Sequence, residues 1–239
     1  MKAMILAAGL GTRLKPFTDK HPKALVVING KTLLQRNIQY LARFGINEII
    51  INVHHFADQV REFILVNNGF GSRISISDET NEILETGGGL KKAGWYFKDD
   101  TSPFVLINVD VLTDMDLSSM INMHKNKSPI ATLSVTVRDT SRYFLFNSKS
   151  QLCGWKNLET GEQKIVRNAS EFYPKAFSGI HVISPGIFPL IKMEGKFSMV
   201  DLYLELAKTQ SVIAFDHSNS KFIDVGKPES ILKAENLFN

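Results

Sequence analysis

Short runs of consecutive apolar residues alternate with stretches of helical spacing through the first half of the chain. The runs IIINV, within 48–54, and FVLINV, within 103–110, carry apolar side chains on successive residues. Because neighbouring strand residues point to opposite faces, such strands are buried on both sides, as in a parallel sheet covered by helices. Strand and helix alternating at this spacing predict βαβ units, and therefore an α/β fold with a Rossmann-like, open and mostly parallel sheet.

The second half of the chain has a different pattern of apolar and polar residues. Its first four predicted strands are short and alternating, and polar turns separate them, which is typical of antiparallel hairpins inserted into the α/β fold. For the first half we predict strands at 2–8, 48–54, 72–78 and 103–110, and helices at 32–45, 56–67 and 88–97. For the second half we predict strands at 130–137, 144–147, 152–155, 163–167, 176–184, 212–216 and 221–226, and helices at 185–191, at 200–210 and from Pro228 onward. No repeat or linker is visible, so we expect a single domain over residues 1–239.

Composition excludes several classes of function. The formal net charge is +4, but Lys and Arg are interspersed with Asp and Glu and form no basic block of the nucleic-acid-binding type. No apolar run approaches the ~18–20 residues of a membrane span, and the apolar start runs directly into charged residues without a cleavage region. The single cysteine, Cys153, excludes an internal disulfide and indicates a cytoplasmic location. We expect no nucleic-acid or membrane partner; the oligomeric state stays open.

A glycine-rich loop follows the first predicted strand. Gly9 and Gly11 precede Arg13, but Leu14 stands where a dinucleotide-binding fingerprint requires its third glycine, and the P-loop spacing is also missing. Small residues let a backbone approach a ligand closely, and successive N–H groups in such a turn can cradle phosphate oxygens. Lys23 adds a second cation shortly afterwards. On spacing alone, a basic turn with solvated charges explains this loop equally well.

A longer pattern distinguishes these two interpretations. LAAGLGTRLKPFT at 6–18, followed by PKAL at 22–25, closely resembles the signature of the sugar-1-phosphate nucleotidyltransferases. Further matching segments are LETGGGL (84–90), INVDVLTDMDL (107–117), FSGIHVISP (177–185) and FIDVGKPE (222–229), so the resemblance extends from residue 1 to about residue 229. The resemblance implies a Rossmann-like core and a Mg²⁺-dependent enzyme that joins a nucleoside triphosphate to a sugar 1-phosphate and releases pyrophosphate.

The resemblance is strongest to short, single-domain members of that family. It implies transfer of UMP from UTP, with N-acetylmuramate 1-phosphate as the candidate acceptor. Two alternatives remain: a guanylyltransferase acting on mannose or heptose 1-phosphate, and a non-catalytic relative that only binds a nucleotide. Many members carry a glycine before their metal-binding aspartate, whereas this chain has Val109 there. This difference motivates the alternative of a non-catalytic relative.

The chemistry of such a transfer explains which side chains it needs. The attacking phosphate monoester is already an anion, with a second pKa near ~6. No general base is therefore required, and the task is to position anions and to neutralise charge as pyrophosphate leaves. Arg13 is the candidate for the β- and γ-phosphates of the leaving group, and Lys23 for the α-phosphate.

Two aspartates are the candidate metal ligands. Asp110 and Asp224 each follow a predicted strand, and Mg²⁺ is usually held by one or two carboxylates together with substrate phosphates and water. We count Asp110 with Arg13 and Lys23 as catalytic. Either aspartate taken singly is also explained as a turn or cap residue. Asp116 is predicted to be the N-cap of a helix, so it is left out of the metal site.

The remaining candidates bind the two substrates. The nucleotide is expected to contact Ala8, Gly9, Gly11, Thr12, Arg13, Lys23, Glu79, Gly88 and Asn108, with the Gly88 backbone reading the edge of the base. Ser178 and Gly179 match the sugar-facing turn of the family, whereas its usual acceptor lysine is not visible and Lys175 is only a weak candidate. The histidines show no metal-ligand spacing, and Cys153 lacks the basic surroundings that activate a thiol.

Overall fold

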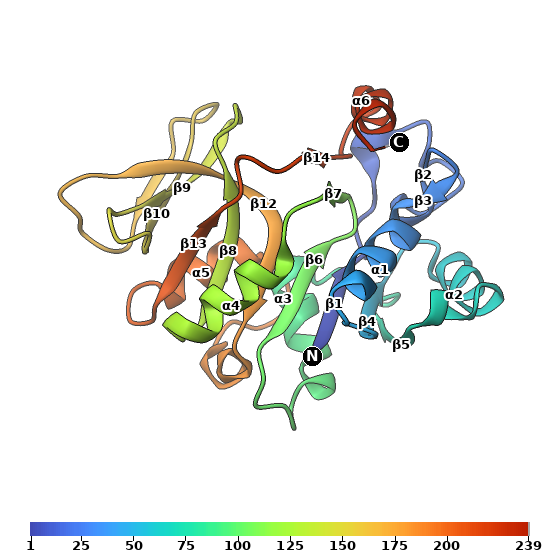
Figure 1. Ribbon diagram of the computed structural model, residues 1–239, viewed down its shortest axis with the longest axis horizontal. Coiled ribbons are helices and arrows are strands. Elements are labelled where there is room, and N and C mark those ends of the chain that lie inside the picture. The colour runs from blue at the N-terminus through green and yellow to red at the C-terminus, as the bar shows by residue number, and fades with distance from the viewer. Residues whose placement is uncertain (239) are drawn as a thin grey trace.

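The computed structural model describes residues 1–238 and contains a ten-stranded central sheet (Figure 1). Its parallel part consists of β1, β4, β5 and β6, in the order β5-β4-β1-β6, and β12 lies antiparallel beside β6. The bounds are Lys2–Leu6 for β1, Glu48–Val53 for β4, Arg73–Asp78 for β5, Phe104–Asn108 for β6 and Tyr173–Ile183 for β12. The predicted mostly parallel α/β sheet is confirmed.

The long strand β12 connects this parallel part to an antiparallel one. Residues 176–183 of β12 pair with β8, whereas residues 173–175 pair with β9, which continues into β10 and β11. Strand β13 adds to β8 in parallel. The bounds are Ala131–Thr136 for β8, Arg142–Phe146 for β9, Leu152–Asn157 for β10, Gln163–Ile165 for β11 and Val212–Asp216 for β13. The predicted antiparallel insertion is therefore present.

Helices cover both faces of the parallel strands. On β1, Ala3 and Ile5 belong to one hydrophobic core, which includes side chains from α1, α2, α4 and α6. Met4 and Leu6 point into a second core, which includes side chains from α3 and α5. The bounds are Leu33–Arg43 for α1, Ala57–Val66 for α2, Glu85–Lys92 for α3, Leu117–Lys127 for α4, Met199–Leu206 for α5 and Glu229–Leu237 for α6. Burial on both faces explains the uninterrupted apolar runs.

Short elements account for most departures from the predicted boundaries. Strand β6 ends at Asn108, two residues before Asp110, because Val111–Thr113 form a separate strand, β7, which pairs with β14 (Phe222–Asp224). The helix predicted at 185–191 is a 3₁₀ helix, Pro185–Leu190, and contains a second proline that cannot donate a backbone hydrogen bond. Further short elements are β2 (Val27–Ile28), β3 (Lys31–Thr32) and the 3₁₀ turns Thr12–Leu14, Lys23–Leu25, Asn68–Gly71 and Ala93–Tyr96.

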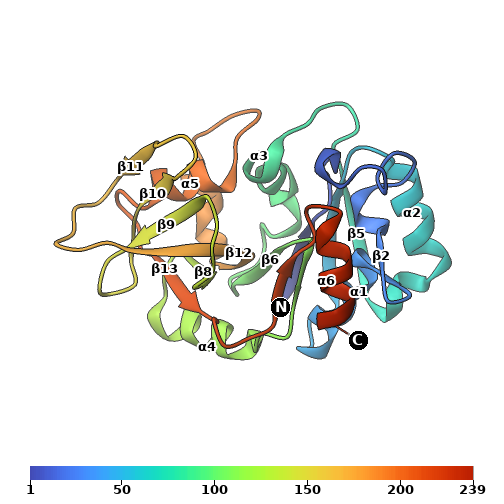
Figure 2. The same ribbon diagram turned by 90° about the horizontal axis from the view of Figure 1, so that it is seen from above.

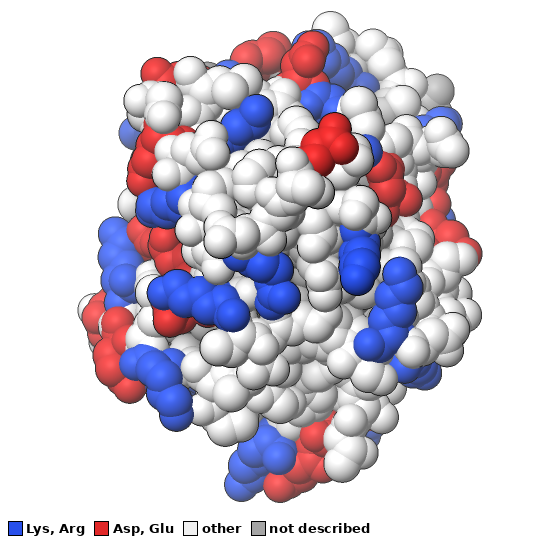
Figure 3. All heavy atoms as spheres, turned by 90° about the vertical axis from the view of Figure 1, so that its left-hand side faces the viewer, with Lys and Arg blue, Asp and Glu red and all other residues white. Residues whose placement is uncertain are grey.

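The end of the described chain returns to the N-terminal half. Helix α6 lies beside the β2–β3 hairpin in both ribbon views (Figures 1 and 2), and Asn29 Nδ2 donates to the Glu235 carbonyl oxygen at 2.7 Å. Strand β14, which precedes α6, pairs with β7 at the end of the molecule where the parallel strands have their carboxyl ends (Figure 1). Figure 3 shows the face at the end of the molecule where β9 and β10 lie in Figure 1. Positive and negative side chains are intermingled on this face. Among the described residues, no helix has the length and apolarity needed to cross a bilayer.

Candidate active site

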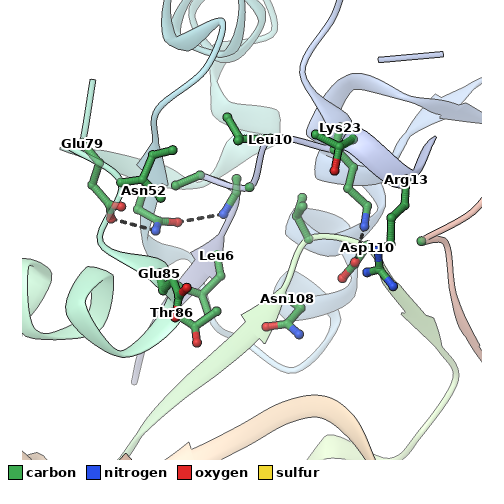
Figure 4. Close-up of a pocket in the computed structure, with 18 of the residues that line it drawn as sticks. Leu6, Leu10, Arg13, Lys23, Asn52, Glu79, Glu85, Thr86, Asn108 and Asp110 are labelled. Carbon is green, nitrogen blue, oxygen red and sulfur yellow. Dashed lines mark hydrogen bonds and ion pairs between the residues drawn. The ribbon is translucent and has the colours of Figure 1, made fainter. Parts of the chain in front are cut away.

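A cavity of about 500 Å³ opens at the carboxyl ends of β1 and β6. Ligands of open α/β sheets bind at this edge. The loop after β1 forms one wall and α3 contributes to another; Figure 4 shows the side chains that point into the space. The lining residues are Leu6, Ala7, Ala8, Gly9, Leu10, Gly11, Thr12, Arg13, Lys23, Asn52, Glu79, Ile83, Glu85, Thr86, Asn108, Val109, Asp110, Ser198 and Gly226.

Gly11 fixes the shape of the loop. Its φ of +66° lies in the left-handed region, and a Cβ there would come within 2.9 Å of Thr18 Cγ2. Thr18 in turn donates its hydroxyl proton to the Gly11 carbonyl oxygen at 2.8 Å. A 3₁₀ turn follows immediately and buries Leu14, which anchors the turn in the core. Glycine is therefore needed here to place Arg13 beside the cavity.

Lys23 and Asp110 form an ion pair inside the cavity. Their side chains are only 12% and 16% exposed, so the pair is poorly screened by water. Asp110 lies in the turn between β6 and β7, and its carbonyl oxygen accepts a hydrogen bond from the Val225 N–H at 2.9 Å. This bond ties the end of β14, and with it Asp224, to the same turn.

Asp224 completes a group of four charged side chains. Its carboxyl keeps contact with solvent, but burial raises its pKa and the neighbouring Asp110 carboxylate raises it further, while Lys23 and Arg13 oppose both effects. Gly226 shows how close these groups are, because a Cβ there would lie 2.8 Å from Asp224 Oδ1 and 3.5 Å from Arg13 Nη2. The fold thus brings two cations from the beginning of the chain and two carboxylates from distant segments into one place.

A chain of hydrogen bonds links the beginning of the glycine-rich loop to Glu79 (Figure 4). Asn52 Oδ1 accepts from the Ala7 backbone N–H at 2.7 Å, and Asn52 Nδ2 donates to Glu79 Oε1 at 2.8 Å. Glu79 is 1% exposed, its Oε2 has no hydrogen-bond partner within residues 1–238, and burial raises its pKa. We did not predict Asn52 as a site residue. The signal was available, since it is the one polar residue in the otherwise apolar run IIINV.

Gly88 does not line the cavity, although we predicted that its backbone reads the base. Its N–H donates to the Phe197 carbonyl oxygen at 3.2 Å, and a Cβ there would overlap the Gly195 carbonyl oxygen. Gly88 therefore allows α3 to pack against residues 195–197. Two residues nearer the start of that helix, Glu85 and Thr86, line the cavity instead, and Glu85 adopts a φ of +59°.

The predicted sugar-facing turn lies next to the cavity. Gly179 has a φ of +73°, and a Cβ there would come within 2.9 Å of Asn108 Nδ2, which lines the cavity. Ser178 is fully buried and its hydroxyl has no partner among the described residues. Lys175, by contrast, is paired with Asp216 at 2.8 Å and is not among the lining residues. Val109 occupies part of the cavity wall and is 4% exposed.

Comparisons with known proteins agree with this architecture. The chain is 31% identical to the N-acetylmuramate alpha-1-phosphate uridylyltransferase of Caulobacter vibrioides, over 98% of this chain and 95% of that protein. It is 29% identical to the mannose-1-phosphate guanylyltransferase catalytic subunit beta of Xenopus tropicalis, with 97% of this chain and 63% of that protein covered. The chain thus spans slightly less than two thirds of the length of the first curated relatives it matches.

Solved structures give the same result. HddC from Yersinia pseudotuberculosis, complexed with GMP-PN, superposes with a TM-score of 0.80 at 28% identity, over 100% of this chain and 99% of that one. The family model described as "Nucleotidyl transferase" matches residues 2–152, more than half of the chain. The chain therefore belongs to the nucleotidyl transferase family, among its sugar-1-phosphate nucleotidyltransferases.

Proposed function

We propose that this protein transfers a nucleoside monophosphate from a nucleoside triphosphate to a sugar 1-phosphate and releases pyrophosphate. UTP is the proposed donor and N-acetylmuramate 1-phosphate the proposed acceptor. The observation that carries the proposal is the meeting of four charged groups from distant parts of the chain: Arg13, Lys23 and Asp110 line one cavity, and Asp224 lies beside it, next to the lining residue Gly226.

The two cations, Lys23 and Arg13, would hold the phosphates and compensate their negative charge. A sugar 1-phosphate supplies its own anionic nucleophile, so the protein must hold two anions together and compensate the charge that develops on the leaving pyrophosphate. Lys23 is mostly shielded from water, which strengthens its attraction for the α-phosphate. Arg13 lines the same cavity, and its guanidinium offers several N–H donors to the β- and γ-phosphates.

Asp110 and Asp224 would hold Mg²⁺. Their carboxylates repel one another, and this repulsion adds to burial in raising the pKa of Asp224. A bound divalent cation would relieve the repulsion. Two carboxylates are also the number of protein ligands usual for a magnesium ion that binds substrate phosphates. When bound, the ion would neutralise phosphate charge and stabilise the transition state. Lys23, now paired with Asp110, would then be free to contact the triphosphate.

The near full-length match to a uridylyltransferase supports UTP as the donor. A second candidate, GTP, is favoured by one specific observation: the buried Oε2 of Glu79 has no partner among residues 1–238. A guanine edge presents two neighbouring donors to a carboxylate, whereas the uracil edge presents one between two acceptors. The relative crystallised with GMP-PN fits this alternative.

Pyrophosphate release with each of the four nucleoside triphosphates tests the proposal. The acceptors are N-acetylmuramate, N-acetylglucosamine and mannose 1-phosphates, assayed with Mg²⁺ and with EDTA. We expect turnover with UTP and N-acetylmuramate 1-phosphate and its loss in EDTA. Selective turnover of GTP would replace the uridylyl assignment. Binding of UTP without pyrophosphate release from any pair would instead support a non-catalytic relative.

A further inference from the structure

Several buried polar groups gather on the side of the cavity away from the glycine-rich loop. Within residues 1–238, four side chains there have buried atoms without a hydrogen-bond partner: Thr136 Oγ1, Arg138 Nε, Ser178 Oγ and both ring nitrogens of His217. Buried polar atoms in folded proteins are paired in about 90% of cases or more. Four such residues, at the ends of β8 and β13 and in β12, therefore call for an explanation other than folding.

Arg138 is the only one of the four that carries a permanent charge. It lies two residues beyond the end of β8, and its Nη2 donates to the Phe177 carbonyl oxygen at 3.0 Å. Its guanidinium carbon lies 5.2 Å from the centroid of the Phe222 ring. Among the described residues, no carboxylate lies within ion-pair distance of it. A half-buried guanidinium without a counter-ion is costly, and an incoming anion would relieve that cost.

The contacts of Arg138 lead directly to the active site. Phe222 and Asp224 are two apart on β14, so their side chains share one face of that strand. Phe177 precedes Ser178 and Gly179, the turn that touches Asn108 on the cavity wall. Arg138 thus contacts both segments that border the cavity beyond Asp224 and Asn108.

We propose that Arg138 binds the phosphate of the sugar 1-phosphate and supplies the cation for the acceptor. The inference rests on the proposed function. Lys23 and Arg13 are assigned to the triphosphate, and Lys175, the acceptor lysine that the sequence suggested, is paired with Asp216 at 2.8 Å. A guanidinium has five N–H donors, of which one here is used by a carbonyl, and its planar fork matches phosphate oxygens.

Arg138→Gln and Arg138→Lys, compared with the wild type, test the inference. Arg142→Gln is the matched control, because Arg142 is an exposed arginine in the same segment. We expect Arg138→Gln to raise KM for the sugar 1-phosphate by about 10–100-fold, the loss typical of a hydrogen bond to a charged group, and to leave KM for the nucleoside triphosphate unchanged. Arg138→Lys recovers part of the loss, and the control resembles the wild type.

Three results would overturn the inference. The first is an unchanged KM for the sugar 1-phosphate, and the second is an equal rise in both KM values, which indicates a structural defect. The third is a defect with N-acetylmuramate 1-phosphate but not with N-acetylglucosamine 1-phosphate, which would assign Arg138 to the sugar carboxylate. Thermal melting of each variant with and without UTP checks folding.

The inference can fail separately from the proposed function. If the wild type releases no pyrophosphate from any pair, the proposed function fails, and calorimetric titration with N-acetylglucosamine 1-phosphate still tests Arg138. Binding to the wild type that weakens by the same 10–100-fold in Arg138→Gln supports the inference. Equal binding to both proteins, or binding to neither, contradicts it.

Discussion

The two sides of the cavity differ in how far their polar groups are already paired. On the side of the glycine-rich loop, Lys23 is paired with Asp110, and Asn52 bonds both to Ala7 and to Glu79, whose Oε2 has no partner within residues 1–238. On the side of Arg138 and Ser178, the polar groups near the turn lack partners within residues 1–238. The polar groups of the first side are thus mostly paired within the protein, whereas the proposed acceptor would supply partners on the second.

This difference has an energetic meaning. Donors held in place by the fold need no rearrangement when charge develops on a phosphate, which is the condition for strong electrostatic stabilisation. Unpaired buried donors reduce the stability of the free protein, but they favour a ligand that satisfies them. Changes on the loop side are therefore expected to affect the rate of the reaction, and changes on the other side to affect acceptor binding and stability.

The largest effect is expected for Lys23→Met, on the loop side. Removing one preorganised charge from a transition state costs ~10²–10³-fold in rate, so kcat with saturating substrates should fall by about that factor. The melting temperature should fall as well, because the shielded Asp110 carboxylate loses its ion-pair partner, so kcat is measured at a temperature where the variant is folded. Lys15→Met is the control, because Lys15 belongs to the same loop but its side chain is 63% exposed. An equal loss in both variants, measured by pyrophosphate release, would contradict the role of Lys23.

Gly179→Ala tests the other side. The substitution places a side chain at a φ of +73° and brings its Cβ within 2.8 Å of Val111 Cγ2. Left-handed backbone costs ~1–2 kcal/mol, and crowding in a packed region adds ~1–3 kcal/mol. Gly161→Ala isolates the crowding, since Gly161 has a φ of +72° with nothing within 4 Å of its Cβ. Chemical unfolding should show a greater loss for Gly179→Ala, and only that variant should have a raised KM for the sugar 1-phosphate.

Histidines extend the comparison to pH. Burial lowers the pKa to about 4 for His124, about 3 for His181 and about 4 for His217, all in the second half of the chain. These groups stay neutral in the folded protein, whereas the unfolded chain binds a proton near the ordinary pKa of about 6.5. Below that pH the unfolded state holds more protons, so the free energy of unfolding falls as pH decreases and recovers as pH rises.

The expected slope is up to ~1.4 kcal/mol per pH unit for each buried histidine between about pH 6.5 and pH 4. Urea unfolding at pH 7, 6 and 5 measures it. His181→Gln, which removes the ring whose Nδ1 lies 2.6 Å from Tyr203 Oη, should be less stable at pH 7 but less sensitive to pH. A slope that the substitution does not alter would mean that this ring does not contribute.

Asp116→Ala should have the smallest effect. Asp116 is the N-cap of α4, as predicted, and its Oδ1 accepts from the Ser118 N–H at 3.0 Å. Loss of such a cap costs ~1 kcal/mol, without a change in either KM. Asp110→Asn provides the contrast, because it is expected to lower kcat strongly, although by less than Lys23→Met. Together the two variants distinguish a capping aspartate from one that serves the reaction. A loss of activity in Asp116→Ala would contradict a purely capping role for Asp116.

Most of the fold was predictable because its signals are local. Apolar runs such as IIINV identify the buried parallel strands, and amphipathic spacing identifies helices such as α1. The boundaries that we missed depend on distant partners. Strand β6 could not be seen to end at Asn108, because β7 forms only by pairing with β14, about one hundred residues later. Glu85 begins α3 in a left-handed conformation that its residue type does not favour.

Site residues that lie close together in the sequence were predictable, whereas those whose role depends on distant contacts were not. The loop around Gly11 and Arg13 forms one compact motif, and its residues line the cavity. Gly88 belongs to a similarly glycine-rich segment but packs against residues 195–197, a contact that no local pattern announces. Arg138 is one of many arginines until the fold places it over Phe222 and beside Phe177 without a carboxylate.

Strand β14 contributes Asp224 after every strand of the ten-stranded sheet has already been passed along the chain. During translation, the growing polypeptide can therefore assemble that entire sheet while it still lacks one of the two acidic groups. The second group arrives only with the segment that returns to dock α6 on the β2–β3 hairpin. A growing chain that still lacks β14 could thus form the sheet while holding only Asp110 of the two carboxylates, and the group of four charged side chains would be complete only once β14 has been made.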